Sequence, residues 1–231
     1  MSSRSSGPDV IDCAWLGAVS YEEAWARQHA RREACRAGAA PEALWALEHP
    51  AVITTGKRAV HDLDRASIRA AGFELHATER GGFATCHEPG QLVVYALLDV
   101  RPTGVRRLVA ALEEGVMDWL AGEGIAAHRR DGAPGVWWEE SKLCAVGLHV
   151  AQGYSMHGLA LNLVNDLRGF GLITPCGLVG TRVGRVCDFV GTEGGDGAAR
   201  WAPERVAPSV LASVRDAVLR ARCVGNAGAA G

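Results

Sequence analysis

The chain has 231 residues, of which 48% are hydrophobic and 22% charged, and this composition predicts one globular domain with a well-developed core. A formal net charge of −2 excludes the overall basic field typical of proteins that bind nucleic acid or an anionic membrane surface. No uncharged apolar run reaches the ~18 residues of a membrane-spanning helix, and the first eight residues lack the apolar segment of a secretory signal, so we expect a cytoplasmic protein.

The first half of the chain alternates helical and extended patterns. The sequence Ser20-x-x-Glu23 predicts a capping box that opens a helix ending near Arg36. The segment 43–57 predicts two extended segments that His49-Pro50 separates, because proline disfavours helix at the residue before it. A short helix is expected over 64–71, and the apolar run 91–98 predicts a strand buried on both faces.

The second half begins with a long amphipathic helix, for which Thr103 is the expected cap and Gly122 the expected end. Two strands over 142–150 and 157–163 are expected to be joined at Gln152-Gly153, and the glycine-rich segment 177–197 to form a loop. A last helix is expected over 203–222. The apolar stripes expected on the two helices are Val105, Leu108, Val109, Leu112, Val116 and Leu120, and then Val206, Val210, Val214 and Val218.

These patterns contain no internal repeat and no linker. We therefore expect a single mixed α/β domain over residues 10–222, with disordered tails at 1–9 and 223–231.

Arg101, Arg106 and Arg107 cluster where the long helix is expected to begin. They are candidates for docking an acidic protein partner, and a solvated helix start is the alternative interpretation.

Seven cysteines occur, an odd number with no Cys-x-x-Cys pair, and this pattern indicates reduced thiols rather than a disulfide framework or a structural zinc site. We assign no metal. Cys13, Cys35 and Cys144 fall in apolar or periodic segments, as core cysteines do. Cys176 lies instead between Pro175 and Gly177, which leaves its sulfur approachable.

Only two of the 24 basic residues are lysines, Lys57 and Lys142. Because a guanidinium stays protonated in proteins, a lysine kept in an arginine-rich chain indicates a task for a deprotonatable amine, although survival by chance on the surface is the alternative.

The segment 80–91, Arg-Gly-Gly-Phe-Ala-Thr-Cys-His-Glu-Pro-Gly-Gln, leads directly into the buried strand. Gly81 and Gly82 allow a ligand to lie against the backbone, and Arg80 and His87 supply polar groups at the rim. A tight turn without a ligand is the other interpretation. Cys86 is a rival nucleophile beside His87, but adjacent residues of an extended segment point to opposite sides.

Four separated segments together resemble the octanoyl (lipoyl) transferases of lipoate synthesis, in the order of that family and over most of the chain. They are Tyr21-Glu-Glu-Ala-Trp-Ala-Arg-Gln28, Glu48-His-Pro-Ala-Val, the Arg80-Gly-Gly…Thr85-Cys-His87…Gln91…Tyr95 signature, and Pro134-Gly-Val…Lys142…Gly147…His157-Gly-Leu-Ala…Asn162…Pro175-Cys-Gly177.

The resemblance implies the α/β catalytic fold, a single mixed-sheet α+β domain, shared with biotin and lipoate protein ligases. It also implies a reaction, with no cofactor, that moves octanoyl from octanoyl-acyl carrier protein to a lysine of a lipoyl domain. The acceptors would be lipoyl domains of 2-oxoacid dehydrogenase complexes and the glycine cleavage H protein. Cys176 would carry the acyl thioester, with Lys142 as its partner. The residues implied to line the acyl site are Arg80, Gly81, Gly82, Phe83, Ala84, Thr85, Cys86, His87, Ala145, Val146, Gly147, Gly158, Leu159 and Ala160.

Three positions depart from the family's usual pattern. Glu88 replaces a glycine, Cys86 replaces a common aromatic, and Gly184-Arg185-Val186 stand where Thr-Ser-Leu is usual. An ATP-dependent lipoate or biotin ligase and a catalytically silent acyl-binding module are therefore kept as alternatives, as is a thiol hydrolase using Cys86 and His87.

Overall fold

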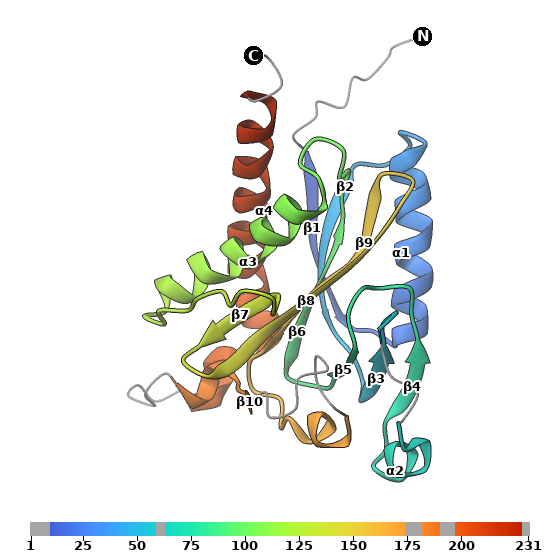
Figure 1. The fold of residues 1–231 in the computed structure, drawn as a ribbon, viewed down its shortest axis with the longest axis vertical. Coiled ribbons are helices and arrows are strands. Elements are labelled where there is room, and N and C mark those ends of the chain that lie inside the picture. The colour runs from blue at the N-terminus through green and yellow to red at the C-terminus, as the bar shows by residue number, and fades with distance from the viewer. Residues whose placement is uncertain (1–9, 59–62, 174–181, 190–196, 228–231) are drawn as a thin grey trace.

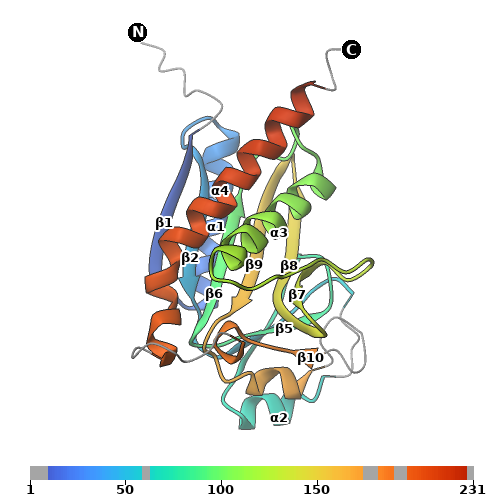
Figure 2. The ribbon, with the colours of Figure 1, turned by 90° about the vertical axis from the view of Figure 1, so that its left-hand side faces the viewer.

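A mixed sheet with helices on both faces forms the body of the molecule, and a smaller sheet lies at one end (Figures 1 and 2). The computed structural model describes residues 10–58, 63–173, 182–189 and 197–227. The large sheet has the order β1-β2-β6-β9-β8-β10, with β7 paired to β8; the strands are β1 Ile11–Ala18, β2 Glu42–Glu48, β6 Gln91–Leu97, β7 Gly135–Trp138, β8 Ser141–Ala151, β9 Tyr154–Asn162 and β10 Arg182–Val183.

The small sheet has the order β4-β3-β5, with β3 at Val52–Thr55, β4 at Glu74–Ala77 and β5 at Ala84–His87. Helix α2, Arg65–Ala70, packs against its β4 edge. The other α-helices of the described residues are α1 Tyr21–Arg36, α3 Val105–Gly122 and α4 Pro203–Ala227, and short 3₁₀ turns cover Arg168–Leu172, Val186–Asp188 and Gly197–Trp201.

Every residue of the central strand β6 is buried, as the unbroken apolar run predicts. Leu92, Val94 and Ala96 point to the face that α3 and α4 cover. Val93 and Tyr95 point to the opposite face, against which α1 packs. Antiparallel pairing of β6 with β9, and of β9 with β8, continues the sheet toward the candidate site.

Several sequence-based expectations about local structure are confirmed. Ser20 caps α1 by accepting the Glu23 N–H at 3.3 Å. The expected break at His49-Pro50 falls between β2 and β3. Gln152 and Gly153 both have positive φ, 53° and 84°, and they form the tight turn between β8 and β9. The mixed α/β class with one large mixed sheet is also confirmed.

Thr103 as the cap of α3 is wrong. The N-cap is Gly104 with φ 75°, and no side-chain hydrogen bond caps the helix. The chain turns tightly here, with the Gly104 N–H bonded to the Val100 carbonyl at 2.7 Å, and a left-handed conformation of this kind suits glycine.

Two further expectations need correction. Val105, placed in the buried stripe of α3, is 46% exposed, because it is the first residue of the helix and the buried part of the stripe begins one turn later, at Leu108. At the other end of the chain, α4 continues through 223–227, since each residue added to an existing helix gains a backbone hydrogen bond. Residues 228–231, like 1–9, lie outside the described residues.

Candidate active site

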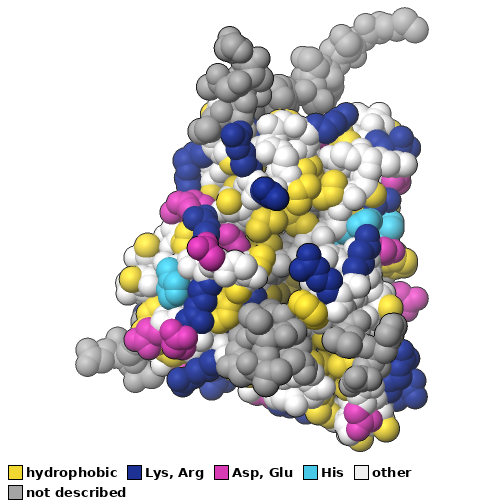
Figure 3. Space-filling view, in the orientation of Figure 1, with side chains coloured by type: hydrophobic (Ala, Val, Ile, Leu, Met, Phe, Trp, Pro, Cys, Tyr) yellow, Lys and Arg dark blue, Asp and Glu magenta, His cyan; other side chains and the backbone are white. Residues whose placement is uncertain are grey.

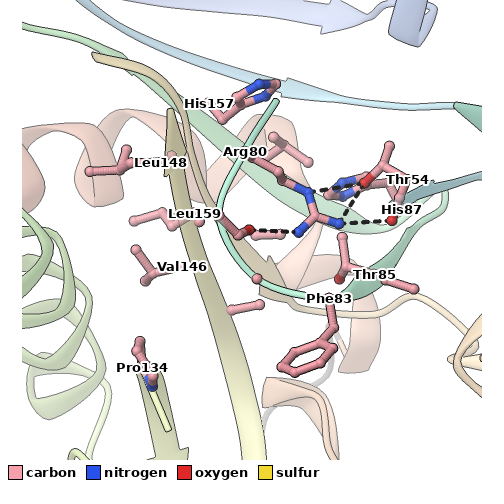
Figure 4. A pocket seen from close by; sticks show the side chains of 18 of the residues that line it. Thr54, Arg80, Phe83, Thr85, His87, Pro134, Val146, Leu148, His157 and Leu159 are labelled. Atoms are coloured by element: carbon pink, nitrogen blue, oxygen red, sulfur yellow. Dashed lines mark hydrogen bonds between the residues drawn. The ribbon is translucent and has the colours of Figure 1, made fainter. Parts of the chain in front are cut away.

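A cavity of about 460 Å³ opens beside the edge of β8. It is lined from the large sheet by β6, β8 and β9, from the small sheet by β5 and the preceding segment 80–83, and from α3 by Val105 and Val109. Figure 4 shows apolar Val146, Leu148 and Leu159 gathered on one side and polar Arg80, Thr85 and His87 on the other. Such a division suits a ligand with an apolar tail and a polar reacting group.

Most of the residues expected from sequence to line the site do line this cavity. They are Arg80, Gly81, Gly82, Phe83, Ala84, Thr85, His87, Ala145, Val146, Gly147, Gly158, Leu159 and Ala160, together with Lys142. Cys86 is the exception. Its side chain is fully buried on the other face of β5, in a cluster with Ile53, Ile68 and Phe73.

The segment 80–82 lies along the edge of β8, where the Gly81 N–H donates to the Leu148 carbonyl at 2.9 Å. Gly147 faces this segment, and a Cβ there would come within 3.4 Å of the Gly81 carbonyl oxygen. The glycines therefore allow backbone to approach backbone, as well as forming a wall of the cavity.

Arg80, which the sequence predicts at the rim of the site, is buried. Its guanidinium is largely buried, and Nη2 donates to the Thr54 carbonyl at 2.7 Å while Nη1 donates to the Gly81 carbonyl at 3.1 Å (Figure 4). A buried cation bonded to carbonyls of both β3 and its own segment holds the small sheet against the cavity wall.

The floor of the cavity is made of small residues that pair across β8 and β9. Ala145 lies opposite Ala160, and Gly147 lies opposite Gly158. At Gly158 the requirement comes from the backbone, because a Cβ there would overlap the Val94 carbonyl of β6. The floor thus leaves room for an extended chain along the strands.

His87 is held in one tautomer by its neighbours. The Gln91 amide nitrogen donates to the Cys86 carbonyl at 3.1 Å and to Asn162 Oδ1 at 2.8 Å, which fixes the amide orientation. Gln91 Oε1 therefore accepts from His87 Nδ1 at 2.7 Å, and Nε2 is left as an acceptor on a residue that lines the cavity. Burial lowers the pKa of His87 to about 3, so the ring is neutral.

Two further histidines, His49 and His157, are also buried. His49 Nδ1 donates to the Val19 carbonyl at 2.7 Å, so Nε2 accepts from the Tyr95 hydroxyl at 2.6 Å. Burial lowers the pKa of His49 to about 4. His157 has φ 60°, its backbone N–H donates to Gln28 Oε1, and burial, followed by the charge of Arg80, lowers its pKa to about 3. All three rings are neutral at physiological pH.

Lys142 is buried, with 6% of its surface exposed, at the start of β8. Its ammonium lies 5.3 Å from the centre of the Trp137 ring, and a Cβ at Gly135 would lie 2.6 Å from its Cε. Gly135, which has φ 130°, therefore makes the space that the lysine side chain fills.

Cys176 lies outside the described residues. Among the described cysteines that are fully buried, burial raises the pKa of Cys144 to about 12 and raises the pKa of Cys86 further. Neither has the thiolate character of a nucleophile at neutral pH.

Glu88 and Arg185, two of the residues that depart from the family pattern, both form hydrogen bonds with Asn165. Glu88 is buried, and its Oε1 accepts from the Asn165 side chain at 3.3 Å. Arg185 donates to the Asn165 main-chain carbonyl at 3.0 Å. Asn165 in turn bonds Asn162, which lines the cavity. Glu88 and Arg185 are thus parts of one structural network, in which burial and then the nearby Asp166 raise the pKa of Glu88.

The lining also contains residues that sequence reasoning did not assign to it, among them Tyr21, Tyr95, His157 and Arg58. The first three stand in the motifs that carry the family resemblance, and that was the available signal. Arg58 follows Lys57 in a segment without a motif. Among the described residues of the lining, Arg58, Arg80 and Lys142 are cationic, and none is an aspartate or glutamate.

A family model and curated relatives of similar sequence both identify the family of this chain. The model of the lipoyl protein ligase A/B catalytic domain matches residues 20–213. An octanoyltransferase of Aromatoleum aromaticum is 44% identical over 188 residues, which cover 80% of each chain. An octanoyltransferase of Azoarcus sp. is 47% identical over 179 residues, covering 75% of this chain and 76% of the relative.

Solved structures show the same fold at lower identity. A lipoate-protein ligase A bound with ATP superposes with a TM-score of 0.63 at 16% identity, covering 89% of this chain and 92% of that one. Biotin protein ligase from Aquifex aeolicus gives a TM-score of 0.52 at 13% identity, covering 91% and 70%. Within the described part of the chain, no helix combines the length and apolar character needed to cross a bilayer.

Proposed function

The chain belongs to the lipoyl protein ligase A/B catalytic domain family as an octanoyltransferase, and from this premise we propose that it moves octanoyl from octanoyl-acyl carrier protein to a lysine of a lipoyl domain. The acceptors are lipoyl domains of 2-oxoacid dehydrogenase complexes and the glycine cleavage H protein, and the reaction takes place in the cytoplasm. The observation that carries the proposal is the cavity, in which a buried lysine stands near a floor of small residues.

In the first half of the reaction, the Cys176 thiolate attacks the thioester carbonyl of the donor. The tetrahedral intermediate collapses with cleavage of the donor's C–S bond, which leaves octanoyl on Cys176 and releases the pantetheine sulfur as a thiolate. Lys142 gives its proton to that thiolate and becomes a neutral amine.

In the second half, the lysine of the lipoyl domain attacks the Cys176 thioester. A new C–N bond forms, the C–S bond to Cys176 breaks, and the neutral Lys142 amine takes the proton that the attacking nitrogen loses. The acceptor lysine arrives as an ammonium, because a side chain of pKa ~10.4 is neutral only about four times in ten thousand at pH 7, so it first releases one proton to solvent. The proton that Lys142 takes as the C–N bond forms is the second one. Lys142 thereby returns to its charged form.

The charge of Lys142 also activates the cysteine. A thiol of pKa ~8.5 is about 3% thiolate at pH 7, and an ammonium that lowers its pKa by ~2 units raises this to roughly three quarters. The Trp137 ring and Gly135 beside Lys142 fix the position of this charge.

The octanoyl tail lies in the cavity along β8 and β9, on the floor formed by Ala145, Gly147, Gly158 and Ala160. Burying about seven methylene or methyl groups at ~0.8 kcal/mol each contributes about 6 kcal/mol before the cost of ordering the chain. The volume of about 460 Å³ falls within the range of ordinary small-ligand sites.

The runner-up is an ATP-dependent lipoate or biotin ligase. The structural likeness to ligases supports the fold alone. A ligase and a transferase differ in the co-substrate and in the catalytic residue that each needs. A ligase activates a free acid as an adenylate and needs no nucleophilic cysteine. A silent acyl-binding module would transfer nothing.

We expect the purified protein to acylate a lipoyl domain from octanoyl-acyl carrier protein without ATP, and the Cys176→Ser variant to lose this transfer by ~1,000-fold or more. The intact mass of the lipoyl domain, followed over time, is the measurement. Transfer that requires free octanoate and ATP, with Cys176→Ser fully active, would establish the ligase instead.

A further inference from the structure

Arg58 and the first turns of α3 both contribute exposed residues to the lining of the cavity, and we call this part of the lining the mouth. Val105 and Val109, one helical turn apart, line the cavity from α3. Val105 is a large apolar side chain that the fold leaves 46% exposed. On the face of the molecule drawn in Figure 3, hydrophobic side chains form a band down the middle, with Lys and Arg side chains on both sides of it.

The charges at this mouth are cationic, although the chain as a whole has a net charge of −2. The described lining of the cavity includes three cations and no carboxylate. Arg58, Arg106 and Arg107 are exposed and form no ion pair with any residue that the structure describes. Arg101, by contrast, is held by Asp99 at 2.6 Å and by the Tyr154 hydroxyl at 3.1 Å.

Helix geometry separates the two arginines of α3. Residues advance about 100° each around a helix, so Arg106 stands next to the face of Val105 and Val109, whereas Arg107 lies on the opposite flank. Leu108 and Leu112, on the same turns of α3, are buried in the core. Only Arg106 therefore borders the mouth, and Arg107 is a neighbouring residue of the same charge and exposure that does not.

We propose that this mouth, formed by Arg58, Val105, Arg106 and Val109, is the docking surface for an acidic carrier protein that delivers the acyl group on a phosphopantetheine arm. The inference rests on the proposed function and adds to it where the donor binds. The arm carries a phosphodiester anion where it joins the carrier, and cations at the rim meet that anion as the thioester enters. Val105 supplies an apolar contact between them.

The same charges favour the donor over the acceptor as the partner of this surface. The pantetheine arm of the donor brings a phosphodiester anion to the rim cations, whereas a lipoyl domain carries no phosphate. Rim charges of this kind act mainly on encounter, so their effect should appear in the carrier's KM and should weaken with salt.

The test compares Arg106→Glu with Arg107→Glu, the matched control. Each variant is assayed with two donors, octanoyl-acyl carrier protein and octanoyl-pantetheine, which lacks both the phosphate and the protein. For Arg106→Glu the ratio of kcat/KM with the carrier to kcat/KM with octanoyl-pantetheine should fall about tenfold, and raising the salt should shrink the difference. For Arg107→Glu the ratio should stay within about twofold of the unmodified protein.

Several results would overturn the proposal. An equal fall with both donors would mean that Arg106 acts on the cavity itself. Equal effects of the two variants would indicate a general field rather than docking at the mouth. A higher KM for the lipoyl domain with an unchanged KM for the carrier would assign the surface to the acceptor. Failure of the unmodified protein to transfer from either donor would instead refute the proposed function.

Discussion

Replacing Lys142 with arginine should lower octanoyl turnover by about 100-fold or more, while Cys176 continues to react with an alkylating agent at a rate much closer to that of the unmodified protein. Arginine keeps a positive charge beside the thiol, so the thiolate still forms. A guanidinium cannot release its proton at working pH, so both the proton transfer to the leaving pantetheine thiolate and the one from the acceptor amine are lost.

Packing around Lys142 adds to this effect. The ammonium and its stem fill the space against Gly135 and the Trp137 ring, and the larger planar guanidinium has to displace one of them. Lys57→Arg is the matched control, since the Lys57 side chain is exposed and the residue is held through its main-chain N–H, which donates to the Arg80 carbonyl at 3.0 Å. Near-normal transfer by Lys142→Arg would show that the residue contributes charge alone.

Acidification should destabilise the protein by about 4 kcal/mol between pH 8 and pH 5.5, because three buried histidines resist protonation in the folded state. Their pKa values are lowered from 6.5 to about 4 for His49 and about 3 for His87 and His157. In the unfolded chain each binds a proton as the pH falls through about 6.5, which favours unfolding by about 1.4 kcal/mol per ring at pH 5.5. The stability is thus present above pH 6.5 and lost below it.

Urea unfolding at the two pH values measures this change. Glu88 acts in the opposite sense, because its raised pKa makes the folded state take up a proton, so it offsets part of the loss. His157→Asn isolates one ring, since asparagine tolerates a positive φ and does not titrate. The variant should lose about 1.4 kcal/mol of the pH dependence; an unchanged pH dependence would mean that His157 is not a neutral buried group.

The parts of this fold that the sequence predicts are those set by local chemistry. Ser20 and Glu23 mark the start of α1, the run 91–97 marks a strand buried on both faces, and Gln152-Gly153 marks a turn. Each depends on residues within a few positions of one another. The cap of α3 was misjudged because Gly104 meets a backbone requirement that Thr103 does not.

The candidate site depends instead on contacts between distant segments. Adjacent residues of a strand point to opposite sides, which explains why His87 lines the cavity while Cys86 joins a separate hydrophobic cluster. Arg80 was expected at the rim, but its bonds to Thr54 of β3 can be seen only once the small sheet is assembled. Glu88 and Arg185, nearly a hundred residues apart in sequence, meet at Asn165 for the same reason.

The covalent intermediate is the central claim, and mass spectrometry of the protein after incubation with octanoyl-acyl carrier protein tests it most directly. Without an acceptor, we expect one octanoyl group to accumulate on the peptide that contains Cys176, and hydroxylamine to remove it, because thioesters are cleaved under conditions that leave amides intact. A protein that transfers octanoyl with no adduct on any cysteine, or that carries the label on Cys86, would contradict the account.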